Sequence, residues 1–463
     1  MKWRVVLAAL FVLLVFAGFA YFYVNAFVRK PQQHAIILFV VNGLDLNTLN
    51  VARQQPGRSP TLSDPDDPAI GDARRRAAYR GERLGIDSFW NVALLNVQDP
   101  GQPVPDEGAN ATALACGQRV QNGFVATNNG NEALPSLIYE AQRAKRATGL
   151  VTTSSLVQPT PVAFYSSTKG TPDPYRNASE LIYSKIDVVL GGGEQYFTPA
   201  SATNEYGRTD GDEPLKDAAD QGYTVIHTRD ELDNFNTWLT PKLLGIFADD
   251  QFYFSSLQPE NRRQPTLAEM TRVAISGLNK NINGYFLVVE HDLVARAAEQ
   301  NFGKLAVNEV TQVDEAIQTA VEYAGPDALV MVTNNYSLGA VGPLPEPDAQ
   351  ELVLPTPNVD AAGKPVQPPA IPLAPAPQPR WLTGPGGPTV AQPQAVWLQR
   401  RSEDGWFNWN YESLLQPEPA FRFQTHAVPT AEPAWLASRG EGSTQLRGFL
   451  NNTDVFDLIN EEF

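Results

Sequence analysis

The chain alternates short apolar runs with amphipathic segments, and this alternation limits its fold more than any other feature. Helical patterns lie at 134–144, 266–279 and 309–325. Five runs between or beside them have the length and β-branched content of strands buried on both faces: AIILFVV (35–41), TGLVTT (148–153), IDVVLGGG (186–193), YFLVVE (285–290) and ALVMVT (328–333). This order predicts an α/β fold with a mostly parallel central sheet and helices on both faces.

A long apolar stretch precedes this pattern. Residues 5–28 are interrupted only by Asn25 and are flanked by basic residues on both sides. A helix of this length is enough to cross the hydrocarbon core of a lipid bilayer. We therefore expect residues 1–33 to form an N-terminal signal anchor, a single transmembrane helix. A cleaved signal peptide is the alternative, although the apolar region of such a peptide usually spans only about 7–15 residues.

The remaining residues, 34–463, are predicted to form one domain that carries an irregular insertion. From about 341 to 420 the chain is rich in proline and then in aromatic residues. Polyproline-like segments form little core of their own. The aromatic residues are candidate interface anchors, because Trp and Tyr are common at protein interfaces; they are Trp397, Trp406, Phe407, Trp409 and Tyr411. The alternative is that these rings only pack the insertion onto the core.

Charge and rare residues narrow the possible functions. The formal net charge of −16 argues against a nucleic-acid partner, which needs clustered Lys and Arg. The chain holds 4 His, so metal sites rich in imidazole are hard to build. A lone cysteine, Cys116, excludes an internal disulfide and is predicted to be a small buried residue.

Polar residues follow several of the predicted strands. Asn42 follows the first strand, Thr152 and Thr153 end the second, Glu290 ends the fourth, and TNNY (333–336) ends the fifth. In a parallel α/β sheet, ligands bind beyond the carboxyl ends of the strands. These residues therefore mark the candidate site.

Several segments, in this order along the chain, resemble the alkaline phosphatase family. They are IILFVVNGLDLNTLNVAR, VPDEGANATALACG, DVVLGGG, FLVVEHDLVARAAEQN, VDEAIQTAVEYA, LVMVTNNYS and a C-terminal segment from THAVPT to NNTDVFDLI. The resemblance runs from about residue 35 to 460 and implies an alkaline-phosphatase-like three-layer sandwich. It also implies a periplasmic or extracytoplasmic domain, which with the signal anchor gives a single-pass topology with a cytoplasmic N-terminus.

The resemblance implies a serine nucleophile and three metal sites, and the matching positions are altered here. Glu107 stands where the family has its serine, and Asn42 where an aspartate bridges two metals. Asn335 and Tyr336 match the aspartate and histidine of one zinc site. A carboxylate is a poor attacker of an anionic phosphate ester, because like charges repel.

The second zinc site is altered as well. Ala295 and Glu299 match its aspartate and its histidine, and only His426 keeps the family residue. A catalytic zinc ion normally needs about three protein ligands and an open position. The matching residues supply at most two.

The magnesium site keeps the most of its ligands. Thr160 and Glu290 match the family, while Asn42 and Gln158 occupy the other two positions. We expect at most weak Mg²⁺ or Ca²⁺ binding at Glu290 and Thr160, and no resident cofactor.

Local alternatives concern Glu107 and the sequence EHD. Glu107 is interpreted either as the cap of its helix or as part of an acidic pocket with Asp106, Glu290 and Glu299, which would bind Ca²⁺ or a partner's Lys or Arg. His291 and Asp292, which follow Glu290, are interpreted as solvated residues rather than as a new metal cluster.

The sequence therefore predicts a catalytically inactive, alkaline-phosphatase-like protein that is tethered to a membrane through residues 5–28. We expect it to act as a structural or interaction subunit beside other proteins of a membrane complex. The alternatives are a divergent metal-dependent phosphatase or phosphodiesterase with altered ligands, and a sensor that binds a ligand in the old cleft.

Overall fold

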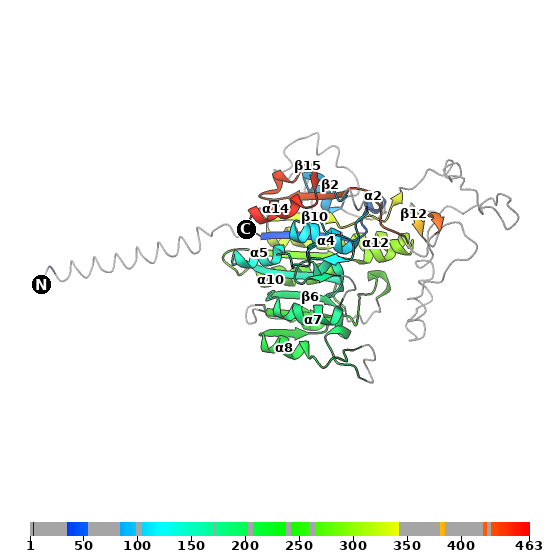
Figure 1. The fold of residues 1–463 in the computed structure, drawn as a ribbon. Coiled ribbons are helices and arrows are strands. Elements are labelled where there is room, and N and C mark those ends of the chain that lie inside the picture. Colours follow the sequence, from blue (N-terminus) through cyan, green and yellow to red (C-terminus); the bar gives the residue numbers. More distant parts are fainter. Residues whose placement is uncertain are drawn as a thin grey trace, which may run out of the picture.

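The computed structural model describes residues 3, 35–53, 84–98, 104–169, 173–201, 207–237, 242–258, 264–341, 380–384, 420–423 and 427–463 (Figure 1). The predicted transmembrane helix, His426 and the five aromatic residues of the predicted insertion lie outside these ranges. Within the described ranges, no helix combines the length and the apolar character needed to cross a membrane.

Ten strands form one large sheet, in the order β15-β2-β14-β10-β1-β9-β4-β6-β8-β7. Their bounds are β1 Ala35–Val41, β2 Asn91–Asn96, β4 Ala147–Ser155, β6 Val188–Gly192, β7 Tyr223–Ile226, β8 Lys242–Ile246, β9 Tyr285–His291, β10 Leu329–Asn334, β14 Ala434–Arg439 and β15 Gly448–Asn451. All neighbours pair in parallel except β14, which is antiparallel to β10 and β2. The predicted mostly parallel sheet is confirmed, and the five predicted strands are β1, β4, β6, β9 and β10.

Two small sheets accompany the large one. Strands β3 (Phe124–Val125) and β5 (Thr168–Lys169) form an antiparallel pair. Strands β11 (Ala340–Val341), β12 (Arg380–Gly384) and β13 (Ala420–Phe423) form the other sheet, so a described strand lies inside the predicted insertion.

Helices fill the connections between the strands. The α-helices are α2 Leu46–Arg53, α4 Glu107–Cys116, α5 Leu137–Arg143, α6 Pro159–Val162, α7 Pro174–Tyr183, α8 Pro214–Asp220, α9 Arg229–Asp233, α10 Leu267–Leu278, α11 Leu293–Glu299, α12 Gly303–Ala324 and α14 Asp454–Glu461. Short 3-10 turns are η3 Gly85–Ser88, η4 Glu194–Tyr196, η5 Ser255–Leu257 and η7 Ser443–Gln445. The three predicted helices correspond to α5, α10 and α12.

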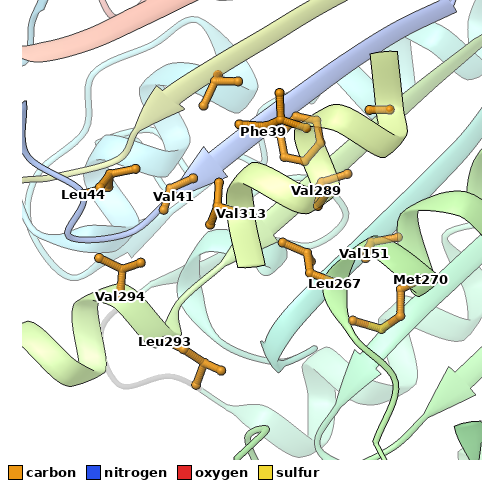
Figure 2. Close-up of a cluster of buried hydrophobic side chains, with 14 of the residues drawn as sticks. Phe39, Val41, Leu44, Val151, Leu267, Met270, Val289, Leu293, Val294 and Val313 are labelled. Atoms are coloured by element: carbon orange, nitrogen blue, oxygen red, sulfur yellow. The ribbon is translucent and has the colours of Figure 1, made fainter. Parts of the chain in front are cut away.

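The central strand β1 shows why the fold has three layers. Its side chains alternate between two buried cores, because successive residues of a strand point to opposite faces of the sheet. Phe39 and Val41 join the core formed with α2, α10, α11 and α12. Figure 2 shows these two side chains in one cluster with residues of α10, α11 and α12. Leu38 and Val40 join the core formed with α4, α5, α7 and α14 on the other face. Helices therefore cover both faces, as predicted.

Strand order and register bring the candidate residues to one place. Strands β10, β1, β9 and β4 are consecutive neighbours in the sheet. Val41 at the end of β1 pairs with Asn334 of β10 and with His291 of β9, and Glu290 pairs with Thr152 of β4. Because these strands run in parallel, their carboxyl ends meet at one edge, where the chain continues into Asn42 and Asn335.

Candidate functional site

Asn42 is the centre of the site. Its side chain is fully buried directly after β1, and its backbone N–H donates to the carbonyl of His291 at 3.0 Å. Its Nδ2 lies 2.9 Å from Glu290 Oε1 and 2.9 Å from Asp292 Oδ1. An amide nitrogen carries two hydrogens and accepts none, so these two short contacts are its main hydrogen bonds, with longer contacts to Glu107 Oε1 at 3.4 Å and to the Thr160 hydroxyl at 3.3 Å. The amide thus holds two carboxylates together by donating to each.

Glu107 is the first residue of α4, but it does not cap the helix. Asp106 is the N-cap, and its carboxylate accepts a hydrogen bond from Ala109 N at 2.8 Å. The interpretation of Glu107 as the cap was therefore wrong, because the preceding aspartate meets the exposed N–H groups first. The Glu107 carboxylate instead accepts from the Thr160 hydroxyl at 2.7 Å and from the Thr160 backbone N–H at 3.2 Å.

Burial raises the pKa of Glu107 to about 7, and the nearby negative charge of Asp292 adds to this effect. The hydrogen bonds from Thr160 and the positive charge of Arg296 act in the opposite direction. Glu107 therefore titrates close to neutral pH.

Glu290, the sixth residue of β9, is fully buried and its carboxylate is surrounded by donors. Besides the Asn42 amide, the hydroxyls of Thr152 and Ser154 on β4 contact its Oε2, the second at 3.1 Å. Burial, then the charges of Asp292 and Glu107, raise its pKa well above the ordinary range. Sequence reasoning placed Thr152 at this edge but missed Ser154.

His291 is not solvated, as the sequence led us to expect, but is 2% exposed. Its Nδ1 lies 3.0 Å from the Thr153 hydroxyl, and its Nε2 lies 3.4 Å from Glu309 Oε2 of α12. Its position at the end of a central strand buries it beneath α12. The imidazole ring is therefore part of the buried contact that joins β9 to β4 and α12.

Asp292 is also buried, at 4% exposed, which corrects the same expectation. Its carboxylate accepts from Asn42 on one oxygen and from Arg296 Nε on the other, at 2.8 Å. Arg296 stands one helical turn later on α11, and its side chain is 35% exposed. Sequence reasoning missed this pair; the i,i+4 spacing of Asp and Arg in DLVAR was the available signal.

Ala295 and Glu299 lie on the same helix. A Cβ on Gly43 would lie 2.6 Å from Ala295 Cα, so α11 approaches the loop after β1 very closely. Gly43 also has a φ of +72°, a conformation that favours glycine. Glu299 ends α11, and burial raises its pKa to about 7 despite the opposing charge of Arg296.

Asn335 and Tyr336 follow β10. Asn335 Nδ2 donates to the Glu107 carbonyl at 3.1 Å and to the Thr160 hydroxyl at 3.2 Å. The Asn335 side chain is 1% exposed, and its Oδ1 is buried without a hydrogen-bond partner in the described part of the chain. Tyr336 is buried, and burial, then Glu107, Asp292 and Glu299, raise its pKa well above the ordinary range.

The short helix α6 contributes the remaining predicted residues. Thr160 is buried and its hydroxyl contacts Asn42, Glu107 and Asn335. Gln158 occupies the N-cap position of α6 but forms no side-chain cap hydrogen bond. Cys116 lies at the far end of α4, where it is buried as predicted and its pKa is raised to about 12 by that burial.

The predicted residues thus fall into three groups. Hydrogen bonds connect Asn42, Glu107, Thr160, Glu290 and Asn335. Glu299 and Tyr336 belong to the same region, because the charges of Glu107 and Glu299 both raise the pKa of the Tyr336 phenol. Ala295 is a buried core residue beside Gly43, and His426 lies outside the described residues.

The side chains at this site do not fit as ligands of the two zinc ions that the resemblance implies. A metal ligand must offer an electron pair, yet Asn42 directs N–H groups at Glu290 and Asp292. In the described part of the chain, no cluster of three or more His, Cys, Asp or Glu side chains is arranged to hold a metal ion. Arg296 supplies a fixed positive charge beside Asp292 instead.

Comparison with known proteins identifies the family. Residues 35–461 match the family model described as alkaline phosphatase. Alkaline phosphatase 4 of Bacillus subtilis is 26% identical over 320 residues, covering 67% of this chain and 62% of that protein. The alkaline phosphatase of Gadus morhua is 28% identical over 352 residues, covering 67% and 70%. The match thus spans somewhat less than two thirds of the Bacillus protein's own length.

Solved structures agree on the fold. The alkaline phosphatase of Thermus thermophilus has a TM-score of 0.64 and 22% identity, with 93% of each chain covered. The enzyme of the Antarctic bacterium TAB5 has a TM-score of 0.61 and 17% identity, with 92% of this chain and 96% of that chain covered. On the match to the family model, this chain belongs to the alkaline phosphatase family.

Proposed function

We propose that this chain is a catalytically inactive member of its family, tethered to a membrane, that acts as a structural or interaction subunit of a membrane protein complex. The observation that supports inactivity best is the Asn42 amide, which donates to both Glu290 and Asp292. These two carboxylates are thus met by hydrogen-bond donors and one guanidinium.

The chemistry of the nucleophile position supports the same proposal. Phosphoryl transfer needs an attacking group and positive charge around the phosphate oxygens. Glu107 brings a carboxyl group, and the Asn42 amide contacts it together with the carboxyl groups of Glu290 and Asp292. A phosphate ester at this place would find no unpaired cation among these residues, because Arg296 is already paired with Asp292.

Family membership keeps one alternative open, a divergent metal-dependent phosphatase or phosphodiesterase. The relatives that match are named alkaline phosphatases. In this alternative, Glu290 and Thr160 would hold Mg²⁺ weakly through oxygen atoms. Use of the old cleft to bind a ligand is the third possibility.

Activity measurements separate these functions. The purified full chain is assayed with p-nitrophenyl phosphate and bis-p-nitrophenyl phosphate, with added Zn²⁺, Mg²⁺ or Ca²⁺, from neutral to alkaline pH. We expect no turnover above that of Glu290→Ala. Metal-dependent turnover that Glu290→Ala abolishes would overturn the proposal and establish the divergent enzyme.

The membrane role rests on the sequence. Residues 5–28 have the length of a transmembrane helix, and the aromatic residues 397–411 offer contacts to other proteins. Extraction of the native membrane with a mild detergent, followed by mass spectrometry, tests both points. We expect other membrane subunits to co-purify; recovery of the chain alone, as a monomer, would argue against an accessory subunit.

A further inference from the structure

We propose that the edge of the large sheet where β10, β1, β9, β4 and β6 begin lies against the lipid interface of the membrane. The candidate site, at the opposite edge of the same strands, then faces the aqueous phase. This orientation rests on the proposed membrane tether, because residues 5–28 must hold the chain in a bilayer before any face of the domain can meet it.

The short connection between the apolar stretch and the domain limits where the membrane can be. Only residues 29–34 separate Val28, the end of that stretch, from Ala35, the first residue of β1. A chain from Val28 to Ala35 spans at most about 25 Å when fully extended. That length is small beside the sheet, which ten strands at a spacing of about 4.8 Å make about 43 Å wide. The start of β1 is therefore held close to the bilayer.

Strand order and direction place four other strand starts beside that of β1. Strands β10, β1, β9, β4 and β6 are consecutive neighbours and all run in parallel. Ala35 pairs with Tyr285, the first residue of β9. The loops before β9 and β4 are also joined, because the amides of Asn281 and Asn283 each donate to the Lys145 carbonyl at 3.1 Å. The edge beside the tether is thus one connected surface.

Large apolar and aromatic side chains are exposed on this edge. Tyr183, the last residue of α7 before β6, is 55% exposed, and Ile282, in the loop before β9, is 72% exposed. Tyr323, near the end of α12 before β10, is 45% exposed. Each of the three lies in the connection to a different strand of this edge. Tyrosine is favoured at the level of lipid headgroups, where its ring meets apolar chains and its hydroxyl stays in water.

Charge does not supply the attraction to the membrane. Lys145 and Lys185 are exposed on this edge, but so are Glu322 and Asp327. The whole chain carries a formal net charge of −16, so anionic lipid would not be favoured. The surface therefore fits zwitterionic lipid, into which apolar and aromatic side chains insert by burial of their apolar area.

A weak contact is enough to orient a domain that is already tethered. A short connection turns the contact with lipid into an intramolecular event, with an effective concentration in the millimolar range. Tyr183, Ile282 and Tyr323 would not recruit a free domain to a membrane. They do favour one orientation over the others once residues 5–28 are in the bilayer.

This orientation decides what can reach the candidate site. Strands β1, β9 and β10 run from the lipid-facing edge to the edge that carries Asn42, Glu290 and Asn335. The seven residues of β1, at about 3.3 Å per residue, separate the two edges by about 23 Å. The site is therefore beyond the reach of lipid headgroups and faces soluble proteins or the protruding parts of membrane subunits.

Fluorescence quenching in phosphatidylcholine vesicles tests the orientation. The full chain carries Cys116→Ala and one new cysteine, either Ile282→Cys or Leu46→Cys, which is labelled with bimane. Leu46 is the matched control, because it is an aliphatic residue, 48% exposed, at the start of α2 on the opposite edge. We expect phosphatidylcholine with a nitroxide at its headgroup to quench the label at position 282 several-fold more strongly than the label at position 46.

A second pair of variants shows whether side-chain contact, rather than the length of the tether, sets the orientation. With the label placed at Tyr183→Cys, Ile282→Asp should reduce quenching, because a carboxylate does not enter the lipid interface. Leu46→Asp, the same change on the opposite edge, should leave quenching unaltered, and thermal unfolding confirms that each variant is folded. Equal quenching at positions 282 and 46, stronger quenching at position 46, or no effect of Ile282→Asp would overturn the proposal.

Flotation of the same vesicles separates this proposal from the proposed function. A chain that does not float with the lipid would overturn the membrane tether and the orientation together. A chain that floats, but whose labels at positions 282 and 46 are quenched equally, would overturn the orientation alone. Phosphatase assays and co-purification need neither label, so they report on catalytic inactivity and on the accessory role independently.

Discussion

Arg296 Nε on α11 lies 2.8 Å from Oδ2 of Asp292, the residue directly before this helix, and forms an ion pair with a carboxylate that is otherwise buried. The other oxygen of Asp292 accepts from the Asn42 amide. An internal cation and an amide thus hold this buried negative charge. Stability of the site is therefore expected to depend on these two donors.

Replacement of Arg296 by alanine should destabilise the fold. The change leaves the Asp292 carboxylate buried without its cation. Losing one partner of a fully buried pair costs about 3–5 kcal/mol, and partial exposure of Arg296 reduces the expected loss to about 2–3 kcal/mol. Urea unfolding of the variant and of the wild type measures this loss of stability.

Two further variants make the Arg296 test specific. Arg143→Ala breaks an exposed pair with Glu140 on α5 and should cost at most about 1 kcal/mol. Asp292→Asn added to Arg296→Ala should recover part of the loss, because it removes the unpaired charge. Equal losses in Arg143→Ala and Arg296→Ala would show that the buried pair has no special role.

Asn42→Asp should also destabilise the chain, by about 3 kcal/mol or more, when chelator is present. The new carboxylate would face Glu290 and Asp292 and replace the donor that now joins them. Added Mg²⁺ should then raise the Tm of the variant but not that of the wild type. Asn50→Asp, at an exposed position on α2 where the side-chain oxygen accepts from Arg53, is the control. Equal Tm values for Asn42→Asp and the wild type in chelator would contradict the assigned role of the amide.

The free energy of unfolding should fall as the pH rises through neutrality, and ionisation of Glu299 is one cause. Its pKa is about 7 in the folded chain and ordinarily 4.5, so the folded state binds the proton more tightly. The stabilisation that comes from this tighter proton binding is fully present below about pH 4.5 and is lost as the pH rises through about 7. Glu299→Gln should therefore raise the free energy of unfolding by about 1–3 kcal/mol at about pH 8, with little effect at about pH 4.

Urea unfolding at several pH values checks this slope. Glu322→Gln, at an exposed position on α12, should leave the pH dependence unaltered. A Glu299→Gln protein that is less stable than the wild type at the alkaline end would show that the ionised carboxylate is stabilising, which is the opposite of what its raised pKa predicts.

Sequence reasoning predicted the sheet well because buried strands carry a local signal. The apolar runs that became β1, β9 and β10 are short, β-branched and bounded by polar residues, so their position needed no tertiary information. Strand β2 was missed because its burial alternates, with Val92 and Leu94 exposed between buried residues. Strand β15 was missed because its residues are mostly exposed.

The site was predicted in part for a similar reason. Strand ends and family resemblance pointed to Asn42, Glu107 and Glu290, since their positions follow from the order of the elements. The position of their partners was not visible. The spacing of Asp292 and Arg296 signals their pair, but their place beside Asn42 follows from the approach of α11 to Gly43, a tertiary contact that no local pattern encodes.

Glu107→Ser tests whether the nucleophile alone separates this chain from phosphatase activity. The change restores the hydroxyl that the resemblance implies at the start of α4, and it removes one carboxylate from the cleft. We expect no hydrolysis of p-nitrophenyl phosphate with Zn²⁺ and Mg²⁺, because Asn42 still donates to Glu290 and Asp292 and Asn335 still offers an amide. The serine would lack the positive charge that lowers its pKa and stabilises the transition state. Glu107→Ala is the matched control. Zinc-dependent turnover in Glu107→Ser that exceeds Glu107→Ala would show that the remaining residues still assemble a metal centre, and that the glutamate alone had silenced it.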